Sequence, residues 1–208
     1  HVGNSATSSS GTYGGTFSFN APNQYLIGSG GDFILDTANC GPFTIPALSA
    51  NRPVLSNPGG TSVEILGQGG ATVANLAITG SGVGIAAGGN LTSPIDGRPT
   101  VVTNTIVLGN GTSATQRGIY LAAPSGDINF RDTAVGGTTA GAFRVDGGNA
   151  NINYQGLIAN NINTNGGVPS TLVDINNTTG GTINLAVGGT PAGALQPNAI
   201  SDLGGQGI

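Results

Sequence analysis

The chain has 208 residues, which is enough for one domain with a substantial buried core. Its cationic residues are five arginines, and with nine acidic residues they give a net charge of −4, which excludes the basic surface typical of nucleic-acid-binding proteins. No apolar run approaches the length of about 18 residues that a membrane-spanning helix needs, so no membrane span is predicted.

Hydrophobic residues make up 37% of the chain and fall in short runs that alternate with polar residues. Such alternation is typical of strands, because successive side chains of a strand point to opposite faces. Almost no segment of helical length carries helix-favouring residues in helical register. The sequence therefore predicts a folded, all-β chain with little helix.

Residues 1–53 are expected to form a lead-in and an irregular N-terminal capping coil. The first twelve residues are small and polar, and we expect them to be loosely held. Short strands separated by Gly- and Pro-rich turns follow, and we place them at 16–19, 25–27, 33–35 and 43–45. Cys40 is expected to be a small buried apolar residue, and His1 lacks the second histidine that a copper site would need, so no metal site is assigned.

Regular repeats begin near Val54 and are expected to form a single continuous domain over 54–208. The run from Val73 to Gly80 aligns with the run from Val102 to Gly109, an offset of 29 residues. Residues 90–99, between the two copies, resemble an insertion with turn chemistry throughout. Lengthening a loop costs only about 0.6 kcal/mol per doubling, so coils of unequal length can still stack.

One phrase of three residues then recurs three times, each time after a turn rich in small polar residues: Ile128-Asn129-Phe130, Ile152-Asn153-Tyr154 and Ile183-Asn184-Leu185. A strand that returns with such a period indicates a stacked repeat. We expect the apolar members to form one buried stripe and the asparagines to form a hydrogen-bonded ladder on the outer face. The repeating unit is interpreted as two short strands joined by a variable connection.

We interpret these repeats as the rungs of a parallel β-helix. An antiparallel sandwich also consists of short strands with Gly-rich turns, but it gives no reason for one phrase to recur in the same setting. The run from Ala199 to Ile208 echoes the run from Ala77 to Ile85, so we expect the chain to stop inside a coil. Unpaired strand edges template pairing, which predicts self-association through the ends of the β-helix as a head-to-tail filament.

The run from Ala74 to Gly80, followed by Gly84-Ile85, resembles right-handed parallel β-helix proteins of the pectin-lyase-like class. The Gly-, Asn- and Thr-rich, Cys-poor background is similar to secreted bacterial surface proteins, namely autotransporter passengers and related β-helical adhesins. The resemblance covers roughly residues 54–208. Because its motifs are those of a fold, it implies a scaffold in an extracellular or cell-surface setting, that is, a structural or adhesive repeat protein or a filament subunit.

Enzymes of that class usually act on polysaccharides from the outer face of one sheet, with clustered carboxylates and an arginine. The nearest candidates here are Asp127, Asn129, Arg131, Asp132 and Asp146. Period-two alternation puts the first three on one outer face. Neighbouring rungs offer amides rather than the second carboxylate of a glycosidase or the several that surround Ca²⁺ in a lyase. The alternative function is thus a β-helix that binds or cleaves a polysaccharide or binds a host-surface ligand; no catalytic residue, cofactor or metal ligand is assigned.

Overall fold

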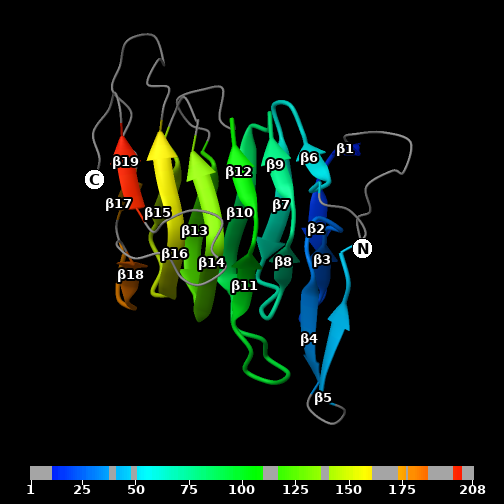
Figure 1. Ribbon diagram of the computed structural model, residues 1–208. Coiled ribbons are helices and arrows are strands. Elements are labelled where there is room, and N and C mark those ends of the chain that lie inside the picture. Colours follow the sequence, from blue (N-terminus) through cyan, green and yellow to red (C-terminus); the bar gives the residue numbers. More distant parts are fainter. Residues whose placement is uncertain are drawn as a thin grey trace.

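The computed structural model describes residues 11–37, 41–47, 51–109, 117–136, 141–160, 173–176, 178–186 and 199–202. These residues form nineteen β-strands and no helix, and the strands lie side by side from one end of the chain to the other (Figure 1). Apart from one hairpin and one isolated bridge, the strand pairs are parallel, and the sheets curl. The prediction of an all-β chain is confirmed, and its parallel pairing is compatible with a β-helix.

The parallel strands form three rows, which we name A, B and C. Row A contains β3 (Tyr25–Ile27), β8 (Thr72–Ala74), β11 (Thr100–Thr103), the first parts of β14 (Asp127–Gly136) and β16 (Asn151–Asn160), and β18 (Ile183–Ala186). Row B contains β1 (Thr12–Gly14), β6 (Val54–Ser56), β9 (Ala77–Thr79), β12 (Ile106–Leu108), the second parts of β14 and β16, and β19 (Ala199–Asp202).

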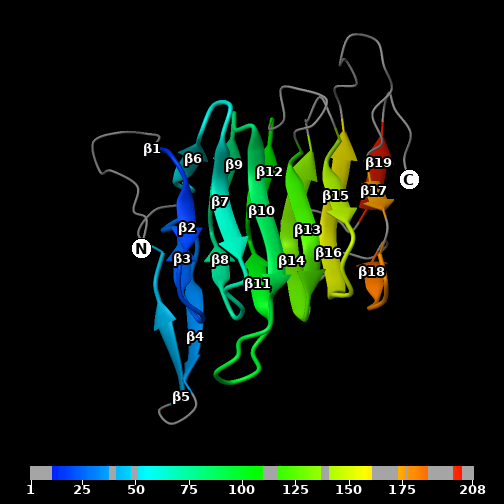
Figure 2. The ribbon, with the colours of Figure 1, turned by 180° about the vertical axis from the view of Figure 1, so that it is seen from behind.

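Row C is a separate six-stranded sheet, whose strands appear in succession in Figure 2: β2 (Phe17–Phe19), β7 (Thr61–Leu66), β10 (Val83–Asn90), β13 (Ile119–Ser125), β15 (Phe143–Asp146) and β17 (Val173–Asn176). The chain visits the rows in a constant order, from C to A to B and back to C. One circuit therefore contains three strand segments, where the sequence predicted two. The sequence did not separate the row A segment from the row B segment that follows it. In β14 and β16 these two segments form one continuous strand, which joins both rows into one eleven-stranded sheet.

The register predicted from the repeats is confirmed. Val73 lies beside Val102, and Ile78 beside Val107, at the predicted offset. The three recurring phrases stack in row A, with Ile152 between Ile128 and Ile183. At the far end, Ala199 pairs with Leu157 and so continues the row that contains Ala77, as the echo between the two runs predicted.

The buried apolar side chains of all three rows belong to one cluster. Ile128, Phe130, Ile152 and Tyr154 are buried in it, whereas Ile183 and Leu185 are half-buried and pack against it, so the predicted stripe is confirmed and becomes more exposed toward β18. Phe130, Phe143 and Tyr154 form a ring cluster with centroid separations between 5.2 and 5.8 Å. The Tyr154 hydroxyl donates to the carbonyl oxygen of Thr133 at 2.9 Å, and burial raises the pKa of Tyr154 well above its usual range.

Residues with left-handed backbone lie at the corner between rows A and B. Asn75 and Asn104 occupy equivalent corners with φ of 59° and 47°, which asparagine tolerates better than most residues. Asn104 donates from Nδ2 to Oδ1 of Asn75 at 2.6 Å, and Arg52 donates from Nη2 to Oδ1 of Asn104 at 2.6 Å. The sequence alignment had already superposed the two asparagines, but it gave no indication of this role.

The N-terminal segment contains the short strands that the sequence predicted. β1, β2 and β3 pair in parallel with β6, β7 and β8. β4 (Phe33–Thr37) and β5 (Gly41–Ile45) form an antiparallel hairpin, which projects from the stacked strands (Figure 1). The expectations for His1 and the rest of 1–10, for Cys40 and for 203–208 concern residues outside the described ranges. Within those ranges, no helix is long and apolar enough to cross a membrane.

Candidate functional site

The outer face of row A carries two columns of side chains. One column runs in register from Tyr25 through Thr72, Val101, Asn129 and Asn153 to Asn184. The other includes Thr103 and Arg131. Their neighbours along each strand, such as Val73, Val102 and Phe130, are buried. The period-two alternation of these strands thus presents a continuous outward surface.

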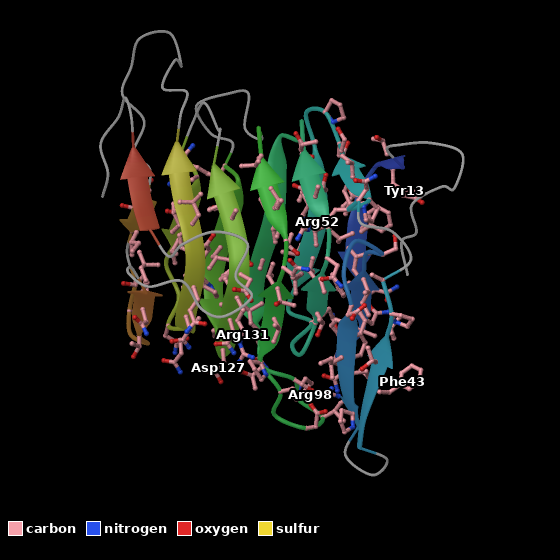
Figure 3. The ribbon with its side chains drawn as sticks, in the orientation of Figure 1. Tyr13, Phe43, Arg52, Arg98, Asp127 and Arg131 are labelled. Carbon is pink, nitrogen blue, oxygen red and sulfur yellow. The ribbon has the colours of Figure 1, made fainter. Side chains whose placement is uncertain are left out.

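This surface is hollowed in two places, which share Arg131. The larger hollow, which we name the hairpin groove, has a volume of about 830 Å³ and lies between the β4–β5 hairpin and the 91–99 loop. The smaller one, which we name the polar hollow, has a volume of about 430 Å³ and is lined mainly by amide side chains: Asn129, Asn153, Gln155 and Asn184. Figure 3 shows Arg98 on the loop, near Arg131 and on the side of the molecule to which the hairpin extends.

The hairpin wall of the groove is apolar. Phe33, Ile34 and Leu35 of β4 line it, and the ring of Tyr25 packs edge-to-face against Phe33 with centroids 6.1 Å apart. Val101 contributes from row A. Phe33 and Leu35 share one face of the strand and are both half-buried, so this wall is an apolar surface partly open to solvent.

The opposite wall is the 91–99 loop, and its charged residues are held in place. The Arg98 guanidinium donates from Nε to Oδ2 of Asp96 at 2.6 Å and from Nη1 to the Tyr25 hydroxyl at 2.7 Å. A hydrogen bond with the Ser93 side chain, assisted by Arg98, lowers the pKa of Asp96 to about 2. Asp96 is therefore ionised at neutral pH and balances the charge of Arg98.

Arg131 lies at the junction of the two hollows with an exposed side chain. Its carbonyl oxygen accepts a hydrogen bond from the backbone N–H of Asn104 at 3.0 Å, which fixes the backbone at this point. The ion pairs among described residues are made by Arg98, Arg117 and Arg144. Among the described residues, no carboxylate lies within ion-pair distance of the Arg131 guanidinium.

The amides of the polar hollow form part of the predicted ladder. Asn153 donates from Nδ2 to Oδ1 of Asn129 at 3.1 Å, and Asn184 stands in register with Asn153. A second ladder lies at the start of the same strands, where Asp127 accepts from the Thr92 hydroxyl at 3.1 Å and from the Asn151 amide at 2.9 Å. The outer side chains of successive rungs are thus joined by hydrogen bonds.

The five candidate residues predicted from sequence do not all converge. Asp127, Asn129 and Arg131 share the outer face of β14, as alternation predicted, and the last two line the polar hollow. Asp132 lies at the corner between rows A and B, with φ of 48°. Asp146 lies in row C, on a different sheet. Sequence alternation gives the face of a single strand, but it does not give the row to which that strand belongs.

Asp146 belongs to a separate charged network on the outside of row C. Arg144 donates to both of its carboxylate oxygens, at 2.7 and 3.0 Å, and the Tyr120 hydroxyl donates to it at 3.1 Å. The hydrogen bond with Arg144 lowers the pKa of Asp146. Asp174 lies 3.5 Å from Arg144 and 4.0 Å from Arg117. These charges pair with one another rather than face the hollows of row A.

Four residues of the hairpin groove were missed by the sequence reasoning: Tyr25, Phe33, Asp96 and Arg98. The available signal was the 90–99 insertion itself, because an insertion that contains two charged residues and interrupts a repeat is a common place for a binding loop. Within the described ranges, no three His, Cys, Asp or Glu side chains group closely enough to hold a metal ion.

Comparison with protein-family models, with curated proteins and with solved structures finds no match to this chain. The resemblance to pectin-lyase-like and surface proteins therefore stays a prediction.

Proposed function

We propose that the chain is a right-handed parallel β-helix that acts outside the cell as an adhesive protein and binds a polysaccharide on the outer face of row A. The observation that carries the proposal is the pair of adjoining hollows on one outward surface, which spans the rungs from β3 to β18.

Two features support the β-helix. The chain visits three parallel rows in constant order, and the two aligned runs of the sequence pair in register in rows A and B. Parallel strands joined by a crossover within one sheet have a right-handed connection in about 98% of cases. The handedness found for such crossovers in known proteins therefore favours a right-handed coil for these rows.

The chemistry of the polar hollow suits a chain of hydroxyl groups. Each amide side chain can both donate and accept hydrogen bonds, and Arg131 adds further donors. These groups repeat from rung to rung at the interstrand spacing of about 4.8 Å. A polysaccharide offers a similarly repeating set of hydroxyl donors and acceptors, so several weak contacts can add along its length.

The carboxylates of the site favour binding over cleavage. Among the described residues that line either hollow, Asp96 alone carries a carboxylate, and Arg98 already holds it. Glycosidases need a pair of carboxylates about 5–9.5 Å apart on either side of the scissile bond. We therefore propose an adhesive contact with the sugar chain intact.

The polysaccharide proposal is tested on a glycan array followed by affinity electrophoresis with the glycan that binds best. Replacing Asn153 and Gln155 together by alanine is expected to weaken binding about tenfold, because each lost hydrogen bond contributes about 0.5–1.5 kcal/mol. Thr79→Ala, an exposed change in row B, serves as the matched control and should leave the affinity unchanged. Absence of glycan binding by the unmodified protein, or equal affinities for both variants, would contradict the proposal.

We also propose head-to-tail self-association through the ends of the rows. Among the described strands, β1, β2 and β3 lie at one end and β17, β18 and β19 at the other, each paired along one side. A contact between unlike ends propagates as a filament unless its rotation closes a ring. Light scattering coupled to size exclusion, with negative-stain images, should show species that grow with protein concentration. A discrete monomer at every concentration would refute the self-association.

A further inference from the structure

We infer that the hairpin groove is a binding site for a small amphipathic anion, a molecule with an apolar body and one carboxylate or sulfonate. The inference goes beyond the proposed function, because it concerns the other hollow and a different class of ligand. It combines the apolar wall, the size of the groove and the charge of Arg131.

The size and lining of the groove fit a compact apolar body. Its volume of about 830 Å³ falls within the range of about 300–1,000 Å³ that is typical of small-molecule sites. Phe33, Ile34 and Leu35 form one wall, and Val101 faces them from row A. Phe33 and Leu35 share one face of β4, and the half-exposed apolar surface that they present leaves water when a ligand covers it, which provides the hydrophobic part of the affinity.

The charge of the groove specifies the polar part of the ligand. Arg98 is balanced by Asp96, so the Arg98–Asp96 pair contributes little net charge. Arg131 is the other cation that lines the groove, and no described carboxylate pairs with it. The planar guanidinium matches a carboxylate or sulfonate with two parallel hydrogen bonds.

The count of charges also argues against other ligands for this groove. A polyanion would need several cations that are not paired with a carboxylate. Among the described residues that line the groove, Arg131 is the one such cation. A neutral apolar ligand would cover part of Arg131 without giving it an anion, at a cost in desolvation. A ligand with a single negative charge beside an apolar body would pair with Arg131 and also cover the apolar hairpin wall.

The inference is tested with a pair of fluorescent dyes that share an apolar skeleton. Anilinonaphthalene sulfonate carries one sulfonate, and phenylnaphthylamine is its uncharged counterpart. The unmodified protein should bind the sulfonate in a saturable manner, with one dye molecule per chain. Arg131→Gln should weaken sulfonate binding about tenfold, the loss of one charge-assisted contact, and should leave the weaker binding of the neutral dye unchanged.

The apolar wall is tested by Leu35→Ser, which should weaken the binding of both dyes about threefold or more. Leu66→Ser is the control, because it makes the same leucine-to-serine change at an exposed position on row C, and it should have no effect. Circular dichroism checks that each variant folds. The double variant with alanine at 153 and 155 should retain dye binding, so failure of the polysaccharide proposal and failure of this one are distinguishable.

Three results would each overturn the inference. The first is that the unmodified protein shows no saturable binding of the sulfonate dye. The second is that Arg131→Gln weakens both dyes equally, which would mean that the guanidinium supports the shape of the groove rather than the anion. The third is that Leu35→Ser and Leu66→Ser have the same effect, which would mean that the dye binds elsewhere.

Discussion

Gly156→Ala is expected to lower the free energy of unfolding by about 2–6 kcal/mol. Gly156 lies where β16 passes from row A to row B, with φ of 149°, a backbone conformation that favours glycine. A Cβ atom there would overlap the backbone carbonyl oxygen of Thr133 on the neighbouring strand. Backbone strain contributes about 1–3 kcal/mol, and overpacking contributes about 1–3 kcal/mol.

Urea denaturation followed by circular dichroism measures this effect, and Gly59→Ala is the matched control. Gly59 also has a positive φ, of 78°, but nothing lies within 4 Å of the position of an added Cβ. Only the strain of the left-handed backbone remains there, about 1–2 kcal/mol. Equal losses for the two variants would mean that β14 and β16 do not approach each other as closely at this bend as the structure shows.

Ile152→Ala is expected to cost about 2–5 kcal/mol, as for other large-to-small changes in a close-packed core. Ile152 is 1% exposed and stands between Ile128 and Ile183 in row A. The neighbouring rungs are held by backbone hydrogen bonds and cannot collapse into the space left by the side chain. The loss therefore includes a cavity as well as the lost transfer of apolar surface out of water.

The adjacent residue provides the control for this second experiment. Asn153 is exposed and donates one side-chain hydrogen bond to Asn129, so Asn153→Ser should cost only about 1 kcal/mol. The same denaturation series measures both variants. Comparable losses would contradict the assignment of Ile152 to the inner face and Asn153 to the outer face.

The elements of the fold were predictable because local patterns determine them. Alternation identified the inner and outer residues of 128–130, and the shared phrase identified the partners of each rung in row A. The offset between the runs that start at Val73 and Val102 gave the register of rows A and B together. These are relations between residues of one strand, or between copies of one motif, and a sequence displays both.

The site was less predictable because contacts distant in sequence create it. Arg98 and Tyr25 are 73 positions apart, and nothing in either segment indicates that their side chains meet. The same limit explains Asp146: its strand has the expected alternation, yet one further corner places it on another sheet. Likewise, a hairpin such as β4–β5 follows from local strand propensity, but the direction in which it projects does not.

The hairpin groove has a mechanical consequence for the stack. Tyr25, Thr72, Val101 and Arg131, which all line it, come from four successive rungs of row A. In the β-helix proposed above, each coil is stabilised mainly by its nearest neighbours, so the coils can separate one at a time. A ligand in the groove would contact several coils at once. It would therefore couple coils that are otherwise coupled only through the coils that lie between them. Its binding energy would then oppose stepwise fraying and make the N-terminal half of the stack melt as a single unit.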